Sequence, residues 1–516
     1  MTFVIDLASY VEDRWLASGG GAELLSAVNS EPVARLPREA GDAGAVLEHA
    51  RNVGGPALRN STYQDRGRLL RALADALNAR KEELYELSYA TGATRADSAF
   101  DIEGGIGALF VYASKAKALP DAHVLADGPR EAISKGNFAG QHILTPLRGA
   151  AVHINAYNFP VWGMLEKLAP TLLAGMPAIA KPARVGSYLT ASAFRIIIES
   201  GVVPLGALQL VLGSTGDLLD RLDGQDAVAF TGSAQTAALL KSGSAIVRET
   251  VRFSAEQDSL NASILGPDAA PGTAEFDLFV KEVVREMTQK AGQKCTAIRR
   301  ALVAEAHIDA AEEAIASRLD KIAIGNPRSE GVRLGALAGL DQRRDVRANI
   351  EMLKGETRAV TGDGPLNLVD ADSEKGAFLA PTLLRCDTPL TSSLVHEVEA
   401  FGPVSTLMPY ANVEEAGAIA RAGKGSLVMS LFSHDRNAIG DIVLATASSH
   451  GRILIVDRDS AADSTGHGAA LPHLLHGGPG RAGGGHELGG LSGMSHYLQR
   501  TAIQAAPDML DRLTAL

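Results

Sequence analysis

Sulfur is scarce in this sequence. The chain of 516 residues has two cysteines, Cys295 and Cys386, and neither has a neighbouring Cys or His at the spacing of a metal-binding motif. Two cysteines also exclude the set of disulfide bridges that stabilises many small secreted proteins. We therefore expect no bound metal and a reducing, cytoplasmic setting.

Long apolar runs and an excess of positive charge are missing as well. No uninterrupted apolar run approaches the ~18 residues that a transmembrane helix needs. The first thirteen residues include three acidic residues and no basic segment, which is unlike a secretory signal. The formal net charge of -11 argues against nucleic acid as the main partner, because phosphate binding needs a basic face. We expect neither a membrane nor a nucleic acid as partner.

Aromatic residues make up only 5% of the chain, whereas glycine is abundant with 54 residues. The hydrophobic share of 46% and the charged share of 21% are typical of a globular protein with a sizeable core. At this length we expect two or three domains. The glycine content favours close-packed α/β layers.

The hydrophobic pattern predicts an α/β organisation. Apolar residues three and four positions apart predict an amphipathic helix over residues 63–90. Further on, predicted strands (150–154, 177–183, 207–213, 227–233) alternate with predicted helices (164–175, 187–201). This alternation indicates right-handed βαβ crossovers and a parallel sheet, whose ligands bind beyond the carboxyl ends of the strands. The residues at those ends are Asn158, Lys181, Gly213 and Ser233.

A second α/β run, between about residues 260 and 450, predicts a further domain. Beyond it, residues 476–493 read HGGPGRAGGGHELGGLSG, in which GPGRAG (478–483) matches the dinucleotide-binding pattern G-x-G-x-x-G. No strand precedes this match, and no crossover helix with a distal acid follows it. We interpret the stretch as a flexible connector.

Cys295 lies in QKAGQKCTAIRR (289–300), just after a predicted helix. Basic residues flank it: Lys290, Lys294, Arg299 and Arg300, with Arg285 one turn further back. Nearby cations would lower the pKa of the thiol and favour the thiolate, which attacks carbonyl carbon. A small buried cysteine with charges pointing to solvent explains the segment equally well. Cys386 follows an apolar strand, which predicts a packing role.

Asn158 and Glu256 each allow two interpretations. Asn158 in AYNFPVW suits a turn, but its amide could also donate to a developing oxyanion. Glu256 in FSAEQDSL could be a surface acid or, if burial raised its pKa, a base that activates water.

Other polar positions could face a ligand or be ordinary loop residues. Lys181 and Arg184 follow an apolar strand and are either cations at the ligand end of the sheet or two exposed charges. Ser233 opens a helix, where free N–H groups favour a phosphate. Glu399 and Phe401 in HEVEAFGPV could belong to a turn before a strand.

Six motifs, in this order, resemble those of the NAD(P)-dependent aldehyde dehydrogenase superfamily. They are YNFP (157–160), KPAR (181–184), FTGS (230–233), Glu256, GQKC (292–295) and EAFGPV (399–404). The resemblance implies an α/β fold with a parallel-sheet, Rossmann-type cofactor domain (1–126 and 148–259) and an α/β catalytic domain (260–455). It also implies a return segment (456–483) and an oligomerisation arm (127–147 and 484–516) that closes a homodimer.

The same resemblance implies roles for individual residues. Cys295 would be the nucleophile, Asn158 with the Cys295 backbone N–H the oxyanion hole, and Glu256 the general base. The coenzyme would be bound by Lys181, Arg184, Gly213, Thr231, Ser233, Glu399 and Phe401. A thiolate adduct of an aldehyde would lose hydride to the nicotinamide, and water would then hydrolyse the thioester to a carboxylate.

The chain departs from the common family pattern in four ways. Residues 255–258 read Ala-Glu-Gln-Asp in place of Glu-Leu-Gly-Gly, Glu256 and Cys295 are further apart than usual, and Ala237 stands where Gly is common. Arg184 stands where many NAD-using relatives have Glu. A carboxylate there repels a 2′-phosphate, whereas arginine binds it, so we predict NADP over NAD.

Within the superfamily, segments such as SAEQDSLNASILG and HGGPGRAGGGHELGG resemble two groups. These are the dehydrogenase half of the ring-opening enzymes of phenylacetate breakdown and the stand-alone 3,4-dehydroadipyl-CoA semialdehyde dehydrogenases of aerobic benzoate catabolism. Because the chain ends at Leu516, soon after the dehydrogenase pattern, we expect the stand-alone type and a CoA-thioester semialdehyde as substrate.

Two alternatives to this function stay open. In a CoA-acylating dehydrogenase, CoA would take the acyl group in place of water, but Glu256 argues against it because transfer to a thiol needs no base that activates water. A non-catalytic, crystallin-type relative is the second alternative. The joint presence of Cys295, Glu256 and Asn158 argues against it.

Overall fold

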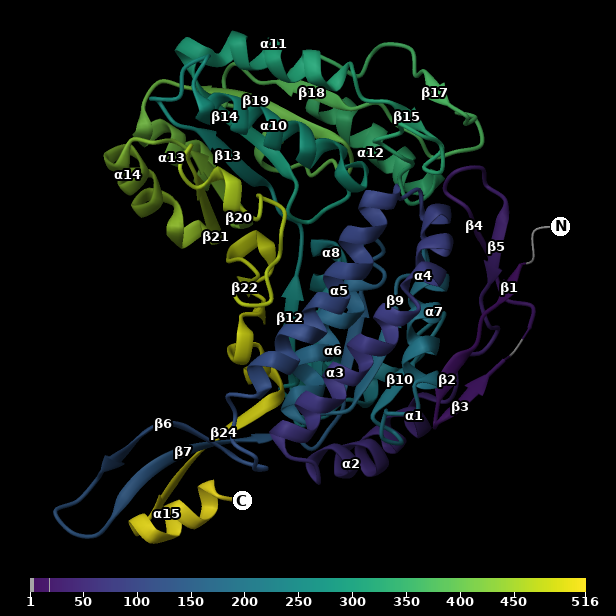
Figure 1. The fold of residues 1–516 in the computed structure, drawn as a ribbon, viewed down its shortest axis with the longest axis vertical. Helices are drawn as coiled ribbons and strands as arrows, with labels where there is room; N and C mark the ends of the chain where they lie inside the picture. Colours follow the sequence, from purple (N-terminus) through teal and green to yellow (C-terminus); the bar gives the residue numbers. More distant parts are fainter. Residues whose placement is uncertain (1–3, 18) are drawn as a thin grey trace.

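The computed structural model describes residues 4–17 and 19–516. Two α/β bodies lie one above the other, and a slender β arm leaves the lower body together with the C-terminal helix α15 (Pro507–Thr514) (Figure 1). Within the described part of the chain, no helix combines the length and apolar character that a bilayer span requires.

The lower body contains a seven-stranded sheet with the strand order β12-β11-β8-β9-β10-β2-β3. Its parallel strands are β8 (Ala151–Asn155), β9 (Ala178–Pro182), β10 (Leu208–Leu210), β11 (Ala227–Thr231) and β12 (Arg252–Glu256). The chain runs from β8 through β9 to β10 and then crosses to the other side of β8 for β11 and β12. This reversal opens a crevice beyond the carboxyl ends of β8 and β11, where such sheets bind ligands.

The predicted parallel sheet is confirmed, and two short strands extend it. The strands β2 (Ser9–Val11) and β3 (Arg14–Leu16) add an antiparallel edge that the hydrophobic pattern did not reveal.

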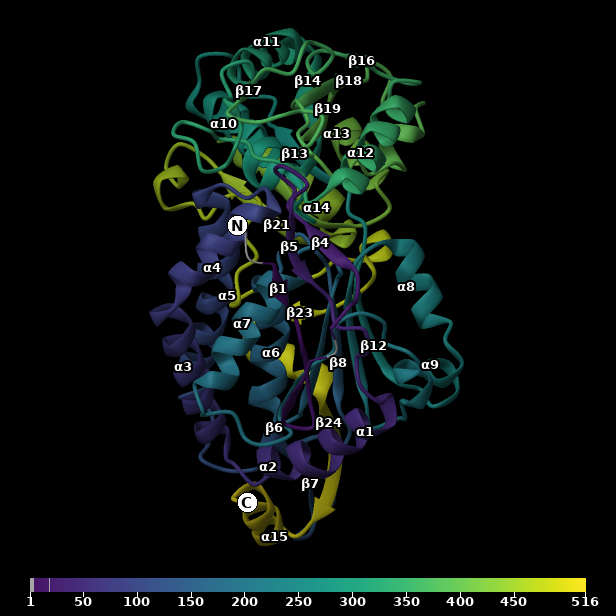
Figure 2. The same cartoon turned by 90° about the vertical axis from the view of Figure 1, so that its right-hand side faces the viewer.

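Helices cover both faces of this sheet (Figure 2). One face carries α3 (Tyr63–Ala79), α4 (Lys81–Ser88), α5 (Arg95–Ala116), α6 (Trp162–Ala174) and α7 (Ser187–Glu199), and the other carries α8 (Ala234–Lys241) and α9 (Ser244–Arg248). The single helix predicted over residues 63–90 is wrong, because Arg80 at φ -117°, ψ 13° leaves helical geometry and separates α3 from α4.

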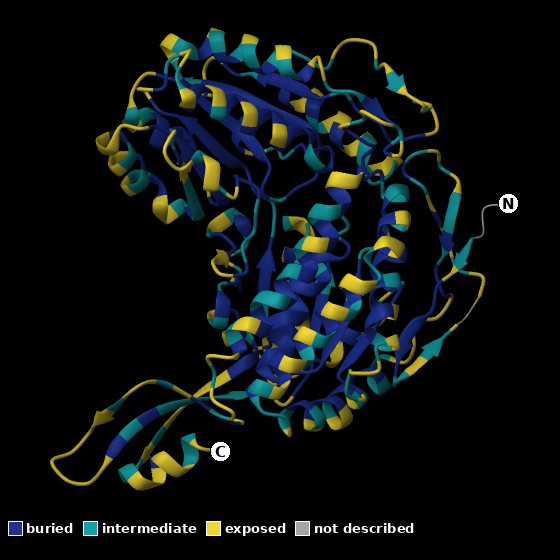
Figure 3. Cartoon of the chain, in the orientation of Figure 1, coloured by how far each residue is buried: buried dark blue, intermediate teal, exposed yellow. Residues whose placement is uncertain are grey.

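The upper body contains a second seven-stranded sheet with the order β16-β18-β19-β14-β13-β20-β21. Its strands are β13 (Asn261–Leu265), β14 (Ile298–Ala304), β16 (Arg358–Ala359), β18 (Thr382–Arg385), β19 (Val404–Tyr410), β20 (Ser426–Phe432) and β21 (His450–Val456). The central strands are buried (Figure 3), and α10 (Ala274–Thr288) packs its apolar face against them. Cys386 is fully buried in this core, which confirms its packing role.

The arm is a separate antiparallel sheet of β6 (Leu125–Ala132), β7 (Ala139–Pro146) and β24 (Leu498–Ala505). Only the last part of the C-terminal tail joins this sheet. The preceding turns, up to Tyr497, pack on α5 and α6 of the lower body.

The glycine-rich stretch after residue 474 is a packed strap between the two bodies, and the prediction of a flexible connector is wrong. We call residues 475–488 the strap; its ends pair as β22 (Leu475–His476) and β23 (Glu487–Leu488). The Gln257 N–H donates to the Ala482 carbonyl at 3.1 Å. A Cβ at Gly478 or Gly483 would overlap neighbouring backbone, so glycine permits the close approach.

Candidate active site

Two cavities meet beyond the carboxyl ends of the lower sheet. The larger has a volume of about 700 Å³ and extends from the ends of β8, β9 and β11 to the upper body. The smaller, of about 40 Å³, is lined by the aromatic side chains of Phe100, Phe159 and Trp162. Both cavities share a wall formed by Ala156, Asn158, Thr231, Glu256 and Cys295. The three residues predicted to be catalytic are thus brought together.

Cys295 is held in a strained loop between α10 and β14. Residues 290–292 take φ values of 56°, 51° and 66° in succession, and such conformations cost about 1–3 kcal/mol for each non-glycine residue. The Lys290 N–H donates to Asp97 at 2.7 Å, and the Asn261 amide donates to the Cys295 carbonyl at 2.7 Å. These bonds fix the loop so that the half-buried sulfur faces both cavities.

The basic residues around Cys295 in the sequence do not surround its sulfur. Lys294 pairs with the buried Glu286 at 2.7 Å, while Arg299 and Arg300 donate to backbone carbonyls. Burial and the nearby Glu256 carboxylate raise the pKa of the Cys295 thiol well above its usual range. The predicted lowering of this pKa by neighbouring cations is therefore wrong, because their charges are engaged elsewhere.

Asn158 lies in the turn between β8 and α6 and is buried. Its Nδ2 donates to the backbone carbonyl of Gln293 at 3.1 Å, which joins the turn to the cysteine loop. The amide nitrogen has a second hydrogen. Because Asn158 and Cys295 line the same wall, that hydrogen suits the oxygen of a substrate bonded to the sulfur.

Glu256 ends β12 in register with Thr231 of β11. Its side chain is buried, and Oε1 has no hydrogen-bond partner among the described residues. Burial raises the pKa of Glu256, but His476 and Lys167 outweigh it and lower the pKa to about 2. The condition set for a base, a pKa raised by burial, is therefore not met, because neighbouring cations outweigh burial and keep Glu256 a carboxylate.

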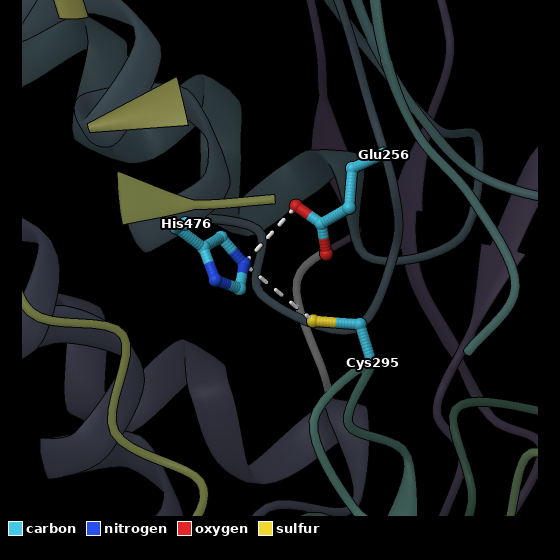
Figure 4. A group of neighbouring side chains, drawn as sticks. All are labelled: Glu256, Cys295 and His476. Carbon is cyan, nitrogen blue, oxygen red and sulfur yellow. Dashed lines mark hydrogen bonds and ion pairs between the residues drawn. The ribbon is translucent and has the colours of Figure 1, made fainter. Parts of the chain in front are cut away.

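His476, which the sequence analysis missed, completes the group. It belongs to β22 of the strap and is 5% exposed. Its Nε2 lies 3.2 Å from Glu256 Oε2 and 4.0 Å from Cys295 Sγ, with the imidazole edge facing both side chains (Figure 4). Burial lowers the pKa of His476, but Glu256 reverses the effect and raises it. A histidine beside a run of glycines gives no local signal of such a position.

Three more buried ionisable residues, also missed, lie next to Glu256: Glu166, Lys167 and Glu487. Lys167 Nζ donates to Thr231 Oγ1 at 2.7 Å and to Glu487 Oε2 at 3.0 Å. Burial raises the pKa of Glu487 to about 7 and also raises the pKa of Glu166. The available signal was a charged pair inside the apolar helical segment MLEKLAP.

The larger cavity brings together most of the predicted coenzyme residues: Lys181, Thr231, Ser233, Glu399 and Phe401. Ser233 is the N-cap of α8, as expected for an anion site, but the Ala234 N–H donates to the Asp258 carboxylate at 3.0 Å. One acid therefore already lies at this helix N-terminus.

Two of the predicted coenzyme residues, Arg184 and Gly213, do not line this cavity. Arg184 is exposed, directly follows the lining residue Ala183, and donates to the Glu23 carbonyl at 3.4 Å. Gly213 follows β10 at φ 88°, in open space.

The larger cavity fits a dinucleotide in size and in position. Both polar side-chain atoms of Asn155 and the Oε1 of Glu399 are buried there without a hydrogen-bond partner among the described residues. Buried polar atoms are nearly always hydrogen-bonded, so these atoms indicate a polar ligand.

Comparisons with known proteins agree with this geometry. Residues 15–503 match the aldehyde dehydrogenase family. The chain is 46% identical over 477 residues to the 3,4-dehydroadipyl-CoA semialdehyde dehydrogenase of Aromatoleum evansii, which covers 92% of this chain and 93% of that protein. It is 48% identical over 177 residues to Protein MaoC of Klebsiella aerogenes, over 34% of this chain and 52% of that protein.

Solved structures show the same fold. Betaine aldehyde dehydrogenase from Staphylococcus aureus, in complex with NAD+, superposes with a TM-score of 0.84 at 23% identity. The superposition covers 97% of this chain and 95% of that one.

Proposed function

The chain belongs to the aldehyde dehydrogenase family, and we propose that it oxidises a CoA-linked semialdehyde to the corresponding acid with NADP+. The observation that carries this proposal is the position of Cys295, Glu256 and Asn158 on the wall between the two cavities. The substrate class rests on the identity with the Aromatoleum protein. A role in aerobic benzoate catabolism rests on the resemblance of the sequence segments alone.

In the first half of the reaction, the sulfur of Cys295 attacks the aldehyde carbon, and the carbonyl oxygen becomes an oxyanion. The free N–H of the Asn158 amide and the backbone N–H of Cys295 donate to this oxygen. Because the loop is held rigidly by Asp97 and Asn261, these donors are in place before the substrate arrives.

A bound coenzyme supplies the hydride acceptor, and loss of hydride from the adduct leaves a thioester on Cys295. Lys181 and Ser233 would hold its adenosine end, and Glu399 and Phe401 its nicotinamide ribose. Glu256 then takes a proton from water, the hydroxide attacks the thioester, and the carbon–sulfur bond breaks to release the acid.

The preference for NADP+ is supported by Arg184. It is a positive charge one residue beyond the cavity wall, and its guanidinium makes one long hydrogen bond among the residues that the structure describes, to the Glu23 carbonyl at 3.4 Å. The remaining donors can bind a 2′-phosphate by charge-assisted hydrogen bonds.

The arm supports a homodimer. Its hairpin extends away from both bodies and exposes the large apolar side chains Ile133 and Phe138 at 47% and 43%. A second copy of the chain would cover them. Sedimentation of the protein and of a Phe138→Asp variant tests this point, and a monomeric parent would contradict it.

The test of the activity compares CoA-linked and free forms of one semialdehyde with each coenzyme. We expect the CoA-linked acid, with one oxygen from isotope-labelled water, and the highest kcat/KM with NADP+. Cys295→Ala should lose all turnover but still bind coenzyme, whereas Cys386→Ala should keep its activity. Acyl transfer that requires free CoA would refute hydrolysis, and no reduced coenzyme from any aldehyde would refute the activity.

A further inference from the structure

The Glu256 carboxylate is held by one of its two oxygens. Oε2 lies 3.2 Å from Nε2 of His476, whereas Oε1 is buried and has no hydrogen-bond partner among the described residues. The oxygen that does not face His476 points toward the Cys295 sulfur (Figure 4). A carboxylate oxygen of Glu256 lies within 4.8 Å of that sulfur, so an acyl group bonded to Cys295 would be next to the carboxylate.

His476 is the donor in this pair. Burial lowers the pKa of its imidazole, but Glu256 of β12 outweighs burial and raises it, and Glu166 of α6 and Glu487 of β23 act in the same direction. Lys167 of α6 neutralises part of that negative charge, because it pairs with both Glu166 and Glu487. The imidazolium has no lone pair, so its Nε2 donates to Glu256 and cannot take a proton from the thiol.

A base at the end of a strand needs such a donor. A glutamate side chain has several rotatable bonds, and ordering a side chain of this length costs about 1.5–2 kcal/mol. A general base must lie within hydrogen-bond reach of the water that it activates, and a displacement of about 1 Å can cost about 10²-fold in rate. His476 is itself fixed, since it is buried and pairs with Glu487 between β22 and β23. The strap therefore brings a rigid donor to a flexible base.

We propose that His476 is a positioning residue, whose Nε2–H holds one oxygen of Glu256 so that the other oxygen faces the acyl group on Cys295. This rests on the proposed function. During hydrolysis, an O–H bond of water breaks and an O–H bond forms on the free oxygen of Glu256. The water oxygen bonds to the acyl carbon, and the carbon–sulfur bond breaks with its electron pair on the sulfur. His476 keeps its proton throughout.

The test follows hydrolysis of an acyl-enzyme without aldehyde or coenzyme. p-Nitrophenyl acetate acylates the Cys295 thiol, release of p-nitrophenol measures acylation, and intact-protein mass follows loss of the acetyl group. Both rates are measured against pH for the parent, His476→Gln and His476→Leu. Glutamine keeps an N–H donor without the charge, and leucine keeps neither. The exposed His486→Gln, ten residues along the strap, is the matched control and should behave as the parent.

The two variants should differ in deacylation alone. Acylation should change to the same extent in both, because both lose the charge near the sulfur. The acid limb of deacylation should move up by about 1–3 pH units in both, because burial raises the pKa of Glu256 and the imidazolium no longer opposes it. At alkaline pH, where Glu256 is ionised in every variant, His476→Gln should deacylate at least as fast as the parent. His476→Leu should be about 10²-fold slower there.

Equal deacylation of His476→Leu and His476→Gln at alkaline pH would overturn the proposal. If His476→Leu does not fold, ¹⁵N NMR gives the answer: one of the thirteen histidines should have both ring nitrogens protonated at neutral pH, and its titration midpoint should fall in Glu256→Gln. No such shift would also overturn the proposal. A parent that hydrolyses the ester but reduces no coenzyme would refute the proposed activity and leave this result intact.

Discussion

Two buried cations behind Cys295, Lys294 and Arg300, differ in kind from the buried acids in front of it. Lys294 binds Glu286 and Gln289, and all three guanidinium nitrogens of Arg300 have hydrogen-bond partners. In front of it, Glu256 and Glu399 each keep a buried oxygen without a hydrogen-bond partner among the described residues. The pKa of His476 and that of Glu487 are raised.

This difference separates groups that shape the site from groups that react in it. A buried ion whose hydrogen bonds are all made is costly to disturb and fixes the backbone around it. A buried ion with unused hydrogen-bonding capacity can change its protonation state or bind a ligand, which is how perturbed groups come to mark active sites.

The largest effect on turnover is expected from Glu256→Gln, which removes one of the buried acids in front of Cys295. Without the base, thioester hydrolysis should slow by about 10²–10⁴-fold, while one equivalent of NADPH is still formed rapidly. Rapid-mixing absorbance separates the burst from the steady state, and an acyl-enzyme should accumulate on Cys295. Glu351→Gln, at the exposed surface of α12 (Leu340–Leu353), is the control. Equal loss of burst and turnover would show that Glu256 acts before the thioester forms.

The second-largest effect is expected at the buried ion pair of Lys294 and Glu286. Lys294→Met leaves Glu286 buried without its cation and should lower the free energy of unfolding by about 3–5 kcal/mol. Denaturant unfolding measures this loss. Lys354→Met removes a lysine that bridges two surface acids and should cost at most about 1 kcal/mol. If Lys294→Met kept its stability but its Cys295 thiol no longer reacted at neutral pH, Lys294 would act in the reaction and not only in the structure.

The residues that carry chemistry at strand ends could be placed from the sequence. Asn158 follows strand β8 and Glu256 ends strand β12, and carboxyl ends of parallel strands meet at one edge of a sheet. The parallel sheet and the packing role of Cys386 were also predicted correctly, because both depend on local apolar patterns.

The remaining features depend on contacts between distant parts of the chain. His476 reaches Glu256 and Cys295 only because the strap crosses between the two bodies, and Lys167 meets Glu487 across 320 residues. The interpretation in which sequence-neighbouring cations lower the pKa of Cys295 failed, because those cations are not its partners in space. Glycines in the strap indicate close packing as readily as flexibility.

Arg184 lies at the edge of the coenzyme cavity, and Arg184→Glu tests whether its guanidinium binds the coenzyme. Among the described residues, Arg184 makes one long hydrogen bond, whereas every guanidinium nitrogen of Arg300 behind the sulfur has a partner. Replacing it with glutamate should weaken NADP+ binding by about 10–100-fold, and NAD+ binding should improve or stay unchanged. Fluorescence titration of both coenzymes measures the change, with the exposed Arg248→Glu as control. Unchanged NADP+ binding would remove the argument for this coenzyme.

The smallest effect expected is a pH dependence at Glu399. Burial raises the pKa of Glu399 to about 7, although Arg299 opposes it. Above this pH the carboxylate can accept from ribose hydroxyls, so NAD+, which has no 2′-phosphate to titrate, should bind several-fold more tightly as pH rises through about 7. Stability should change in the opposite sense. The folded state binds this proton more tightly than the unfolded state, so the free energy of unfolding falls between about pH 4.5 and about pH 7. Glu399→Gln should flatten both curves, and a variant that keeps the pH dependence of NAD+ binding would assign it to another group.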